Sequence, residues 1–119
     1  MYSKELLNHF QNPRNAGELS SPTAQAQVEN PACGDVMQLS ITVASQSGKI
    51  TEARFRAKGC VAAIACGSLL SELLQGITLD EARHLQREEL IAKLGGVPAE
   101  SVHASHLAMD ALSAVLAKV

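Results

Sequence analysis

Apolar and polar residues alternate most clearly over residues 37–43, where every second side chain is apolar. This period of two predicts a strand with one buried face. A second alternating run, at 53–57, follows the loop at 45–48. The two runs predict a hairpin, and residues 24–28 are expected to add a short edge strand.

The second of these strands has a charged face opposite its apolar one. A charged face of this kind is most often simply solvated, although it could also receive an acidic partner. The charged side chains are Glu52, Arg54, Arg56 and Lys58.

Helix signals occupy the rest of the chain. Ser3 can cap a first helix that ends before Pro13. Residues 62–74 are apolar on nearly every side, which predicts a buried helix. Thr78 and Glu81 form the capping-box pattern of a third helix.

Two more helices are expected before the chain ends. Residues 87–94 predict a helix that Gly95 and Gly96 stop. Pro98 is placed to start the last helix, because its fixed φ suits a first helical position. The apolar stripe of that helix is expected at Val102, Met109, Leu112, Val115, Leu116 and Val119.

The order of these elements predicts the fold class. One helix is followed by a meander of strands and then only by helices, which favours an α+β fold with helices packed on one face of a small antiparallel sheet. The length of 119 residues predicts a single domain over 1–119.

Composition narrows the function classes. The net charge of −2 gives no electrostatic reason to expect nucleic acid. No apolar run approaches a membrane span and no leader opens the chain, so a soluble, cytoplasmic protein is expected. Three cysteines, spaced by 27 and then 6 residues, fit no disulfide framework, CxxC redox pair or zinc finger.

Chemistry-bearing side chains stand where three elements begin or end. Cys33 and Asp35 flank a glycine in a turn, Cys60 follows a strand, and His103 begins a helix. Two thiols, a carboxylate and an imidazole can complete a four-ligand metal site. The alternative is that each cysteine is structural and the histidine a surface residue; Gly34 beside Cys33 and Gly59 beside Cys60 favour the site.

The remaining candidates have weaker cases. Cys66 is interpreted as a small core residue, because six helical residues rotate it about 240° away from Cys60. His106, one turn after His103, could reach the same metal or lie as a polar residue on the rim. His9 and His84 show no partner in the sequence.

Several motifs resemble those of the U-type iron–sulfur cluster assembly scaffolds, the IscU family and the N-terminal domain of NifU. Tyr2 and Ser3 precede a segment similar to the N-terminal signature of that family. Three further motifs follow in order at fitting spacings. The matching segments are HFQNPRNAG (9–17), PACGDVM (31–37), FRAKGCVAAIA (55–65), and VHAS (102–105) with LAMDA (107–111).

The resemblance implies a three-stranded sheet with helices, the fold of IscU, NifU and SufE proteins, and an exposed site at one end. It implies a scaffold or carrier, not an enzyme, that accepts sulfur from a cysteine desulfurase, binds iron or a 2Fe–2S cluster, and passes the cluster to apo iron–sulfur acceptor proteins. By position, its ligands and sulfur acceptors are Cys33, Asp35, Cys60 and His103. The isolated protein is expected to hold zinc, as a monomer or weak homo-oligomer.

Two departures from the family pattern leave alternatives open. The family carries a third cysteine after the histidine, where this chain has Ala104, whose side chain is expected to border the site. A zinc-binding sulfur-acceptor protein and a metal-binding desulfurase partner that builds no cluster therefore remain possible functions. The segment VPAES (97–101) keeps little of the Hsp70-type chaperone motif of the family, which makes that partner doubtful.

Overall fold

The computed structural model describes residues 1–31 and 33–119, so Ala32, part of the motif around Cys33, lies outside the described residues. The elements follow in the order α1 (Lys4–Gln11), β1 (Ala24–Glu29), β2 (Val36–Val43), β3 (Ile50–Lys58), α2 (Val61–Leu74), α3 (Leu79–Arg83), α4 (Arg87–Lys93), the 3₁₀ helix η1 (Ala99–Ser101) and α5 (Val102–Leu116).

The three strands form one antiparallel sheet in the order β1-β2-β3. Its register pairs Leu39 with Ala26 on one side and with Phe55 on the other, which places these apolar side chains on the same face. All three are buried. The opposite face carries the polar and charged residues that alternate with them, as the period of two predicts.

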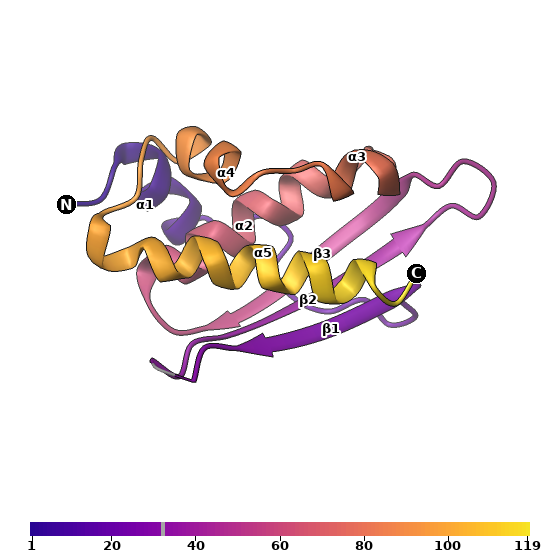
Figure 1. The fold of residues 1–119 in the computed structure, drawn as a ribbon, viewed down its shortest axis with the longest axis horizontal. Coiled ribbons are helices and arrows are strands. Elements are labelled where there is room, and N and C mark those ends of the chain that lie inside the picture. Colours follow the sequence, from indigo (N-terminus) through magenta and orange to yellow (C-terminus); the bar gives the residue numbers. More distant parts are fainter. Residues whose placement is uncertain (32) are drawn as a thin grey trace.

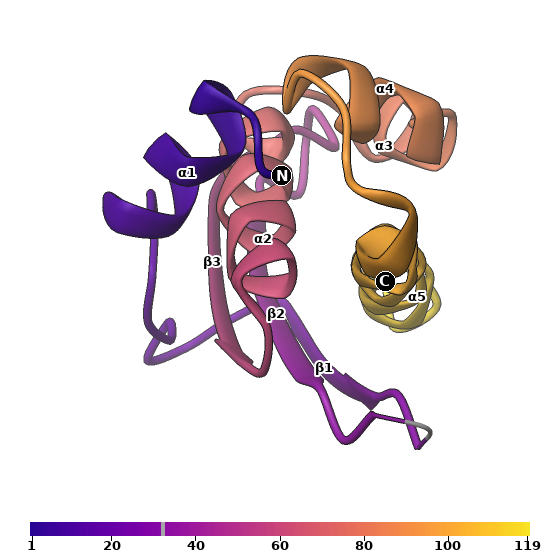
Figure 2. The same ribbon diagram turned by 90° about the vertical axis from the view of Figure 1, so that its left-hand side faces the viewer.

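Helices α2 and α5 cover the apolar face of the sheet (Figure 2). Helix α1 packs against α2, while α3 and α4 lie farther from the sheet. The predicted α+β class, with a three-stranded antiparallel sheet and helices on one face, is confirmed. No helix within the described residues is long and apolar enough to cross a membrane.

The predicted N-terminal capping residues of α1 and α3 and the predicted burial of α2 are confirmed. The Ser3 hydroxyl accepts a hydrogen bond from Leu6 N–H at 3.0 Å and caps α1. Thr78 and Glu81 form the reciprocal capping box of α3. Helix α2, predicted to be buried, has ten buried residues among its fourteen.

The last helix differs from its prediction at both ends. Pro98 precedes the 3₁₀ helix η1, and α5 begins only at Val102. The helix ends at Leu116, so Val119 lies beyond it and is exposed. The buried face of α5 also differs from the predicted apolar stripe, because it includes small side chains that hydropathy alone undervalues. It consists of Ala104, Ser105, Leu107, Ala108, Ala111, Leu112 and Val115.

Candidate metal centre

Three chain segments meet at one end of the sheet. They are the loop between β1 and β2, the junction between β3 and α2, and the first turn of α5 (Figure 1). The sequence placed its candidate ligands at these three positions. Because the antiparallel register brings the start of β2 beside the end of β3, residues far apart in the chain become neighbours here.

The loop between β1 and β2 holds the first thiol and the carboxylate. Its ends are joined by a hydrogen bond from Asn30 N–H to the Asp35 carbonyl at 2.8 Å, and Gly34 N–H donates to the Asn30 carbonyl at 2.7 Å. Gly34 has φ +77°, the left-handed conformation expected for this glycine. The turn leaves Cys33 exposed and buries Asp35.

Cys60 has a structural role that the sequence analysis missed. It is the N-cap of α2, and its sulfur accepts a hydrogen bond from Ala63 N–H at 3.4 Å. Cysteine is not among the common N-cap residues, but its position directly before an apolar helix was a usable signal. The cap fixes the half-buried thiol at the open end of the sheet.

His103 is the second residue of α5 and faces the other candidates. Its Nε2 lies 3.4 Å from Oδ2 of Asp35 and 3.7 Å from Sγ of Cys60. Ligand atoms of Cys33, Asp35 and His103 all lie within 4.8 Å of one another. The structure therefore brings three of the four candidates together and places the fourth, Cys60, against the imidazole.

The candidate ligand atoms of this cluster make few hydrogen bonds within the part of the protein that the structure describes. Oδ2 of Asp35 is buried and accepts no hydrogen bond from the residues that the structure describes, although it lies 3.4 Å from Nε2 of His103. A buried carboxylate oxygen without a partner is costly, and a bound cation would remove that cost. Thiol, carboxylate and imidazole are also a donor set that zinc and iron accept.

The thiol of Cys60 is protonated more readily than an ordinary cysteine. Burial raises its pKa, the hydrogen bond from Ala63 lowers it, and the Asp35 carboxyl beside it raises it again, with a net upward shift. A metal ion would reverse this balance, because it binds the thiolate and releases the proton.

Cys66 does not belong to the cluster. It is fully buried among apolar side chains in the middle of α2, which confirms its interpretation as a core residue. Burial raises the pKa of its thiol to about 12, with a smaller contribution from Cys60. It is therefore neither an accessible thiol nor a thiolate at neutral pH.

Ala104 lies on the core side of α5. The residue has no exposed surface and belongs to the hydrophobic core, and the expectation that its side chain borders the site stays a prediction. The reason for this burial is rotation: successive helical residues turn by about 100°, so His103 and Ala104 point in different directions.

His106 is exposed, on the outer side of α5. It contributes to the wall of a groove beside the cluster, formed by the end of β1, the following loop and α5. It does not join the metal-ligand group found among the described residues. The structure thus places His106 on the rim, one of the two positions considered from the sequence. The groove is lined by Glu29, Asn30, Pro31, His103, His106, Leu107 and Asp110.

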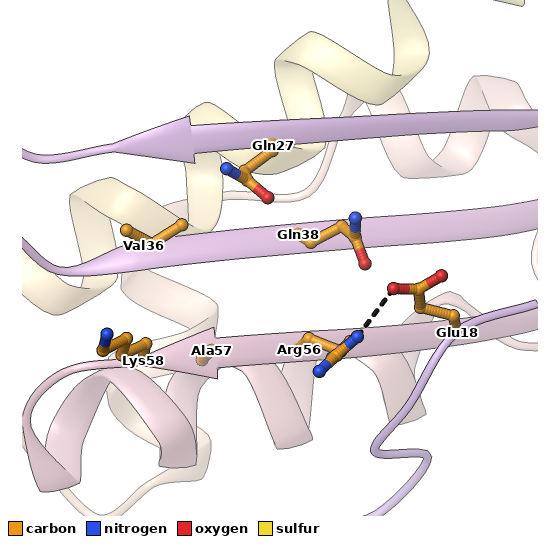
Figure 3. A pocket seen from close by; sticks show the side chains of 7 residues that line it. All are labelled: Glu18, Gln27, Val36, Gln38, Arg56, Ala57 and Lys58. Carbon is orange, nitrogen blue, oxygen red and sulfur yellow. Dashed lines mark hydrogen bonds and ion pairs between the residues drawn. The ribbon is translucent and has the colours of Figure 1, made fainter.

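A second hollow lies on the open face of the sheet, away from the helices (Figure 3). Arg56 pairs with Glu18 at 2.7 Å across this hollow, and both side chains are largely exposed. The charged face predicted for β3 is thus the uncovered side of the sheet. Its walls contain no thiol or imidazole: they are Glu18, Gln27, Val36, Gln38, Arg56, Ala57 and Lys58.

Comparison with known sequences identifies relatives along nearly the whole chain. The model of the NifU-like N terminal domain family matches residues 1–119. The iron–sulfur cluster assembly scaffold protein IscU of Haemophilus influenzae is 41% identical, over 98% of this chain and 93% of its own length. IscU of Escherichia coli K12 is 40% identical, over 98% and 91% respectively.

A solved structure shows the same fold at lower sequence identity. The N-terminal part of a NifU-like protein from Brucella abortus superposes with a TM-score of 0.63 and 24% identity, covering 98% of this chain and 82% of that one. At this identity the likeness concerns the fold alone.

Proposed function

Because this chain belongs to the NifU-like N-terminal domain family, we propose that it is a scaffold and carrier for iron–sulfur cluster assembly. One observation carries the proposal: a thiol, a carboxylate and an imidazole from distant parts of the chain lie within 4.8 Å of one another at one end of the sheet. The cluster is the cargo of such a protein, which binds and transfers it rather than catalysing turnover.

We assign the ligands to Cys33, Asp35, Cys60 and His103. The two thiols supply the soft ligands that iron–sulfur clusters prefer. The carboxylate is a hard ligand that exchanges more readily, and an exchangeable ligand suits a cargo that must leave. Oδ2 of Asp35 supports this assignment, because it accepts no hydrogen bond from the described residues that a metal ion would have to replace.

The two thiols differ in accessibility, which supports different roles. Cys33 is exposed in a loop, whereas Cys60 is half-buried and caps α2. We propose that Cys33 accepts sulfur: its thiolate attacks the outer sulfur of a desulfurase persulfide, a new S–S bond forms, and the desulfurase cysteine leaves as a thiolate. Reduction of that sulfur to sulfide takes two electrons from an external donor.

The same donor set binds zinc, and we propose that the isolated protein carries about one zinc ion per chain. The partners that follow from the proposal are a cysteine desulfurase and apo iron–sulfur acceptor proteins. A cytoplasmic location is supported by three free cysteines, since thiols stay reduced in that compartment.

Anaerobic reconstitution with iron, cysteine and a desulfurase tests the function. We expect visible absorption of a 2Fe–2S cluster in the wild-type protein and in Cys66→Ala, and its loss in Cys33→Ala and Cys60→Ala. Zinc content of the same four proteins, purified without iron, should follow the same order.

The contrary outcomes separate the alternatives. Zinc binding and persulfide formation without any cluster would favour a zinc-binding sulfur-acceptor protein. Zinc binding with neither sulfur acceptance nor cluster would favour a desulfurase partner that builds none. Equal zinc content in all four proteins would contradict the ligand assignment itself.

A further inference from the structure

Gly59 lies between the end of β3 and Cys60, against the side chain of Asp35. Its φ is +151°, a conformation that residues with a side chain rarely adopt. A Cβ atom at this position would lie 2.9 Å from Cβ of Asp35 and closer still to its carboxyl carbon and Oδ1. The carboxyl group of Asp35 therefore occupies space that exists only because residue 59 is glycine.

This arrangement determines where the carboxylate lies. Asp35 is 6% exposed, so its side chain is packed among neighbouring groups, and an added methyl group at residue 59 would press against it. With Gly59 on one side, its Oδ2 lies 3.4 Å from the imidazole of His103. Cys60 directly follows Gly59 in the chain. Displacement of the Asp35 carboxylate would therefore change the position of that carboxylate relative to both Cys60 and His103.

Two other glycines also lack room for a Cβ, Gly67 against Phe55 and Gly95 against Glu5 and Ser3, but none of those side chains is a candidate ligand. Gly17, Gly34, Gly48, Gly76 and Gly96 also have positive φ, but a Cβ at each would have none of the described residues within 4 Å. These positions need glycine for backbone conformation alone. Gly59 is distinguished by a close approach to a candidate ligand, so its role goes beyond the turn it forms.

We infer that Gly59 is a positioning residue for Asp35. By having no side chain, it lets the carboxylate settle between Cys60 and His103, where Oδ2 accepts no hydrogen bond from the described residues and is available to a metal ion. The inference rests on the proposed function in one respect, namely that Asp35 is a ligand. Its steric part is that a side chain at residue 59 and the carboxyl group of Asp35 cannot occupy the same space. This part does not depend on that function.

A double-mutant cycle tests both parts, with Gly59→Ala, Asp35→Gly and the combined variant. Zinc affinity is measured by competition with a chromophoric chelator. We expect Gly59→Ala to weaken zinc binding about 10- to 100-fold, the range found when the support of a ligand is removed. The combined variant should bind no more weakly than Asp35→Gly, because Gly59 acts through the Asp35 carboxylate.

Urea unfolding of the metal-free proteins measures the steric part without any metal. Gly59→Ala should lower the unfolding midpoint more when residue 35 is Asp than when it is Gly, since the combined variant lacks the clash. Gly17→Ala is the matched control: its φ is +127° and its Cβ would meet nothing. That control should lower the midpoint through backbone strain and leave zinc affinity unchanged.

The possible results are distinguishable. The inference is overturned if Gly59→Ala binds zinc like the wild type, or if its loss adds fully to that of Asp35→Gly. Should Gly59→Ala fail to fold, folding of the combined variant supports the inference and failure of both overturns it. If Asp35→Gly keeps full zinc affinity while the midpoints remain coupled, the ligand role of Asp35 falls and the steric part stands.

Discussion

Two histidine–carboxylate pairs lie in different parts of this molecule, and they are built in opposite ways. In the pair that joins α1 to α2, the side chain of His9 is 10% exposed and that of Glu72 is 51% exposed. In the pair at the end of the sheet, the side chain of Asp35 is 8% exposed and that of His103 is 33% exposed. The buried member is the imidazole in the first pair and the carboxylate in the second.

The surroundings of the buried group differ as well. Nδ1 of His9 lies 2.7 Å from the hydroxyl of Ser68, which also accepts a hydrogen bond from Arg14 N–H at 2.8 Å. The other nitrogen, Nε2, lies 3.8 Å from Glu72. Nδ1 of His9 thus has a hydrogen-bond partner, and these contacts connect α1 and the segment after it to α2.

At the end of the sheet the buried oxygen, Oδ2 of Asp35, accepts no hydrogen bond from the described residues and has only Nε2 of His103 nearby, at 3.4 Å. A buried polar group with its partners in place stabilises the fold, whereas an unpartnered one costs free energy unless a ligand is bound. The comparison therefore teaches that the same two residue types serve structure at His9 and suit ligand binding at Asp35.

The largest expected effect separates the two histidines by metal affinity. His103→Ala should weaken zinc binding by more than about 100-fold, because loss of an outer-shell partner alone costs 10- to 100-fold. His9→Ala should leave zinc binding unchanged. Chelator competition on both variants checks this, and equal losses would break the comparison.

Stability should rank the two histidines in the opposite order. His9→Ala leaves the Ser68 hydroxyl without its buried partner and should lower the free energy of unfolding by about 1–3 kcal/mol. His103→Ala should change the free energy of unfolding of the metal-free protein by less than about 0.5 kcal/mol, as expected at a partly exposed position. Urea unfolding in the presence of a chelator measures both, and a larger cost for His103→Ala would contradict the structural role assigned to His9.

The carboxylates provide the next test. Asp35→Ala should make a bound cluster persist longer and transfer more slowly to an apo-ferredoxin, because the exchangeable ligand is gone. Glu72→Ala serves as its control and should transfer at the wild-type rate. Visible absorption and circular dichroism follow the transfer, and a faster reaction with Asp35→Ala would count against its role in release.

The pH dependence of stability should identify His9. Burial lowers its pKa below the ordinary value of 6.5, the Arg14 cation lowers it further, and Glu72 opposes both. The unfolded chain therefore binds a proton more readily than the folded one, so the contribution of His9 is complete above pH 6.5 and is lost as the pH falls below it.

The effect of His9 on the pH dependence of stability has an upper limit, because only one proton is involved. The slope that His9 adds is at most about 1.4 kcal/mol per pH unit, on the acid side of its unfolded pKa. Urea unfolding of the wild type and His9→Gln between pH 5 and 7 isolates it, because the other titrating groups are common to both. Parallel curves would show that His9 does not titrate differently on folding.

The smallest expected effect concerns Ala104, where the family resemblance suggests a missing thiol. Since Ala104 is fully buried, the thiol of Ala104→Cys should react with iodoacetamide far more slowly than that of Cys33. Mass spectrometry of the alkylated metal-free protein distinguishes the two. Reaction as fast as that of Cys33 would mean that the first turn of α5 opens, and a cysteine there could then act as an acceptor.

The sequence by itself determined the elements and their class. Strand periodicity gave β2 and β3, because alternation needs only the local geometry of an extended chain. The cap at Ser3 and the capping box of Thr78 and Glu81 are likewise local, and both were predicted. Side-chain chemistry at the ends of predicted elements singled out four candidate ligands, the family resemblance pointed to the same four, and their assignment to a metal stays a prediction.

Only the tertiary structure decided which side each residue faces and which atoms meet. It buried Ala104, shifted the stripe of α5, and gave His9 a partner on α2 that no local pattern indicates. It also placed Gly59 against Asp35, a contact made across two strands. These features depend on sheet register and helix rotation, where an error of one residue reverses a face, so they follow from the packing of the whole chain.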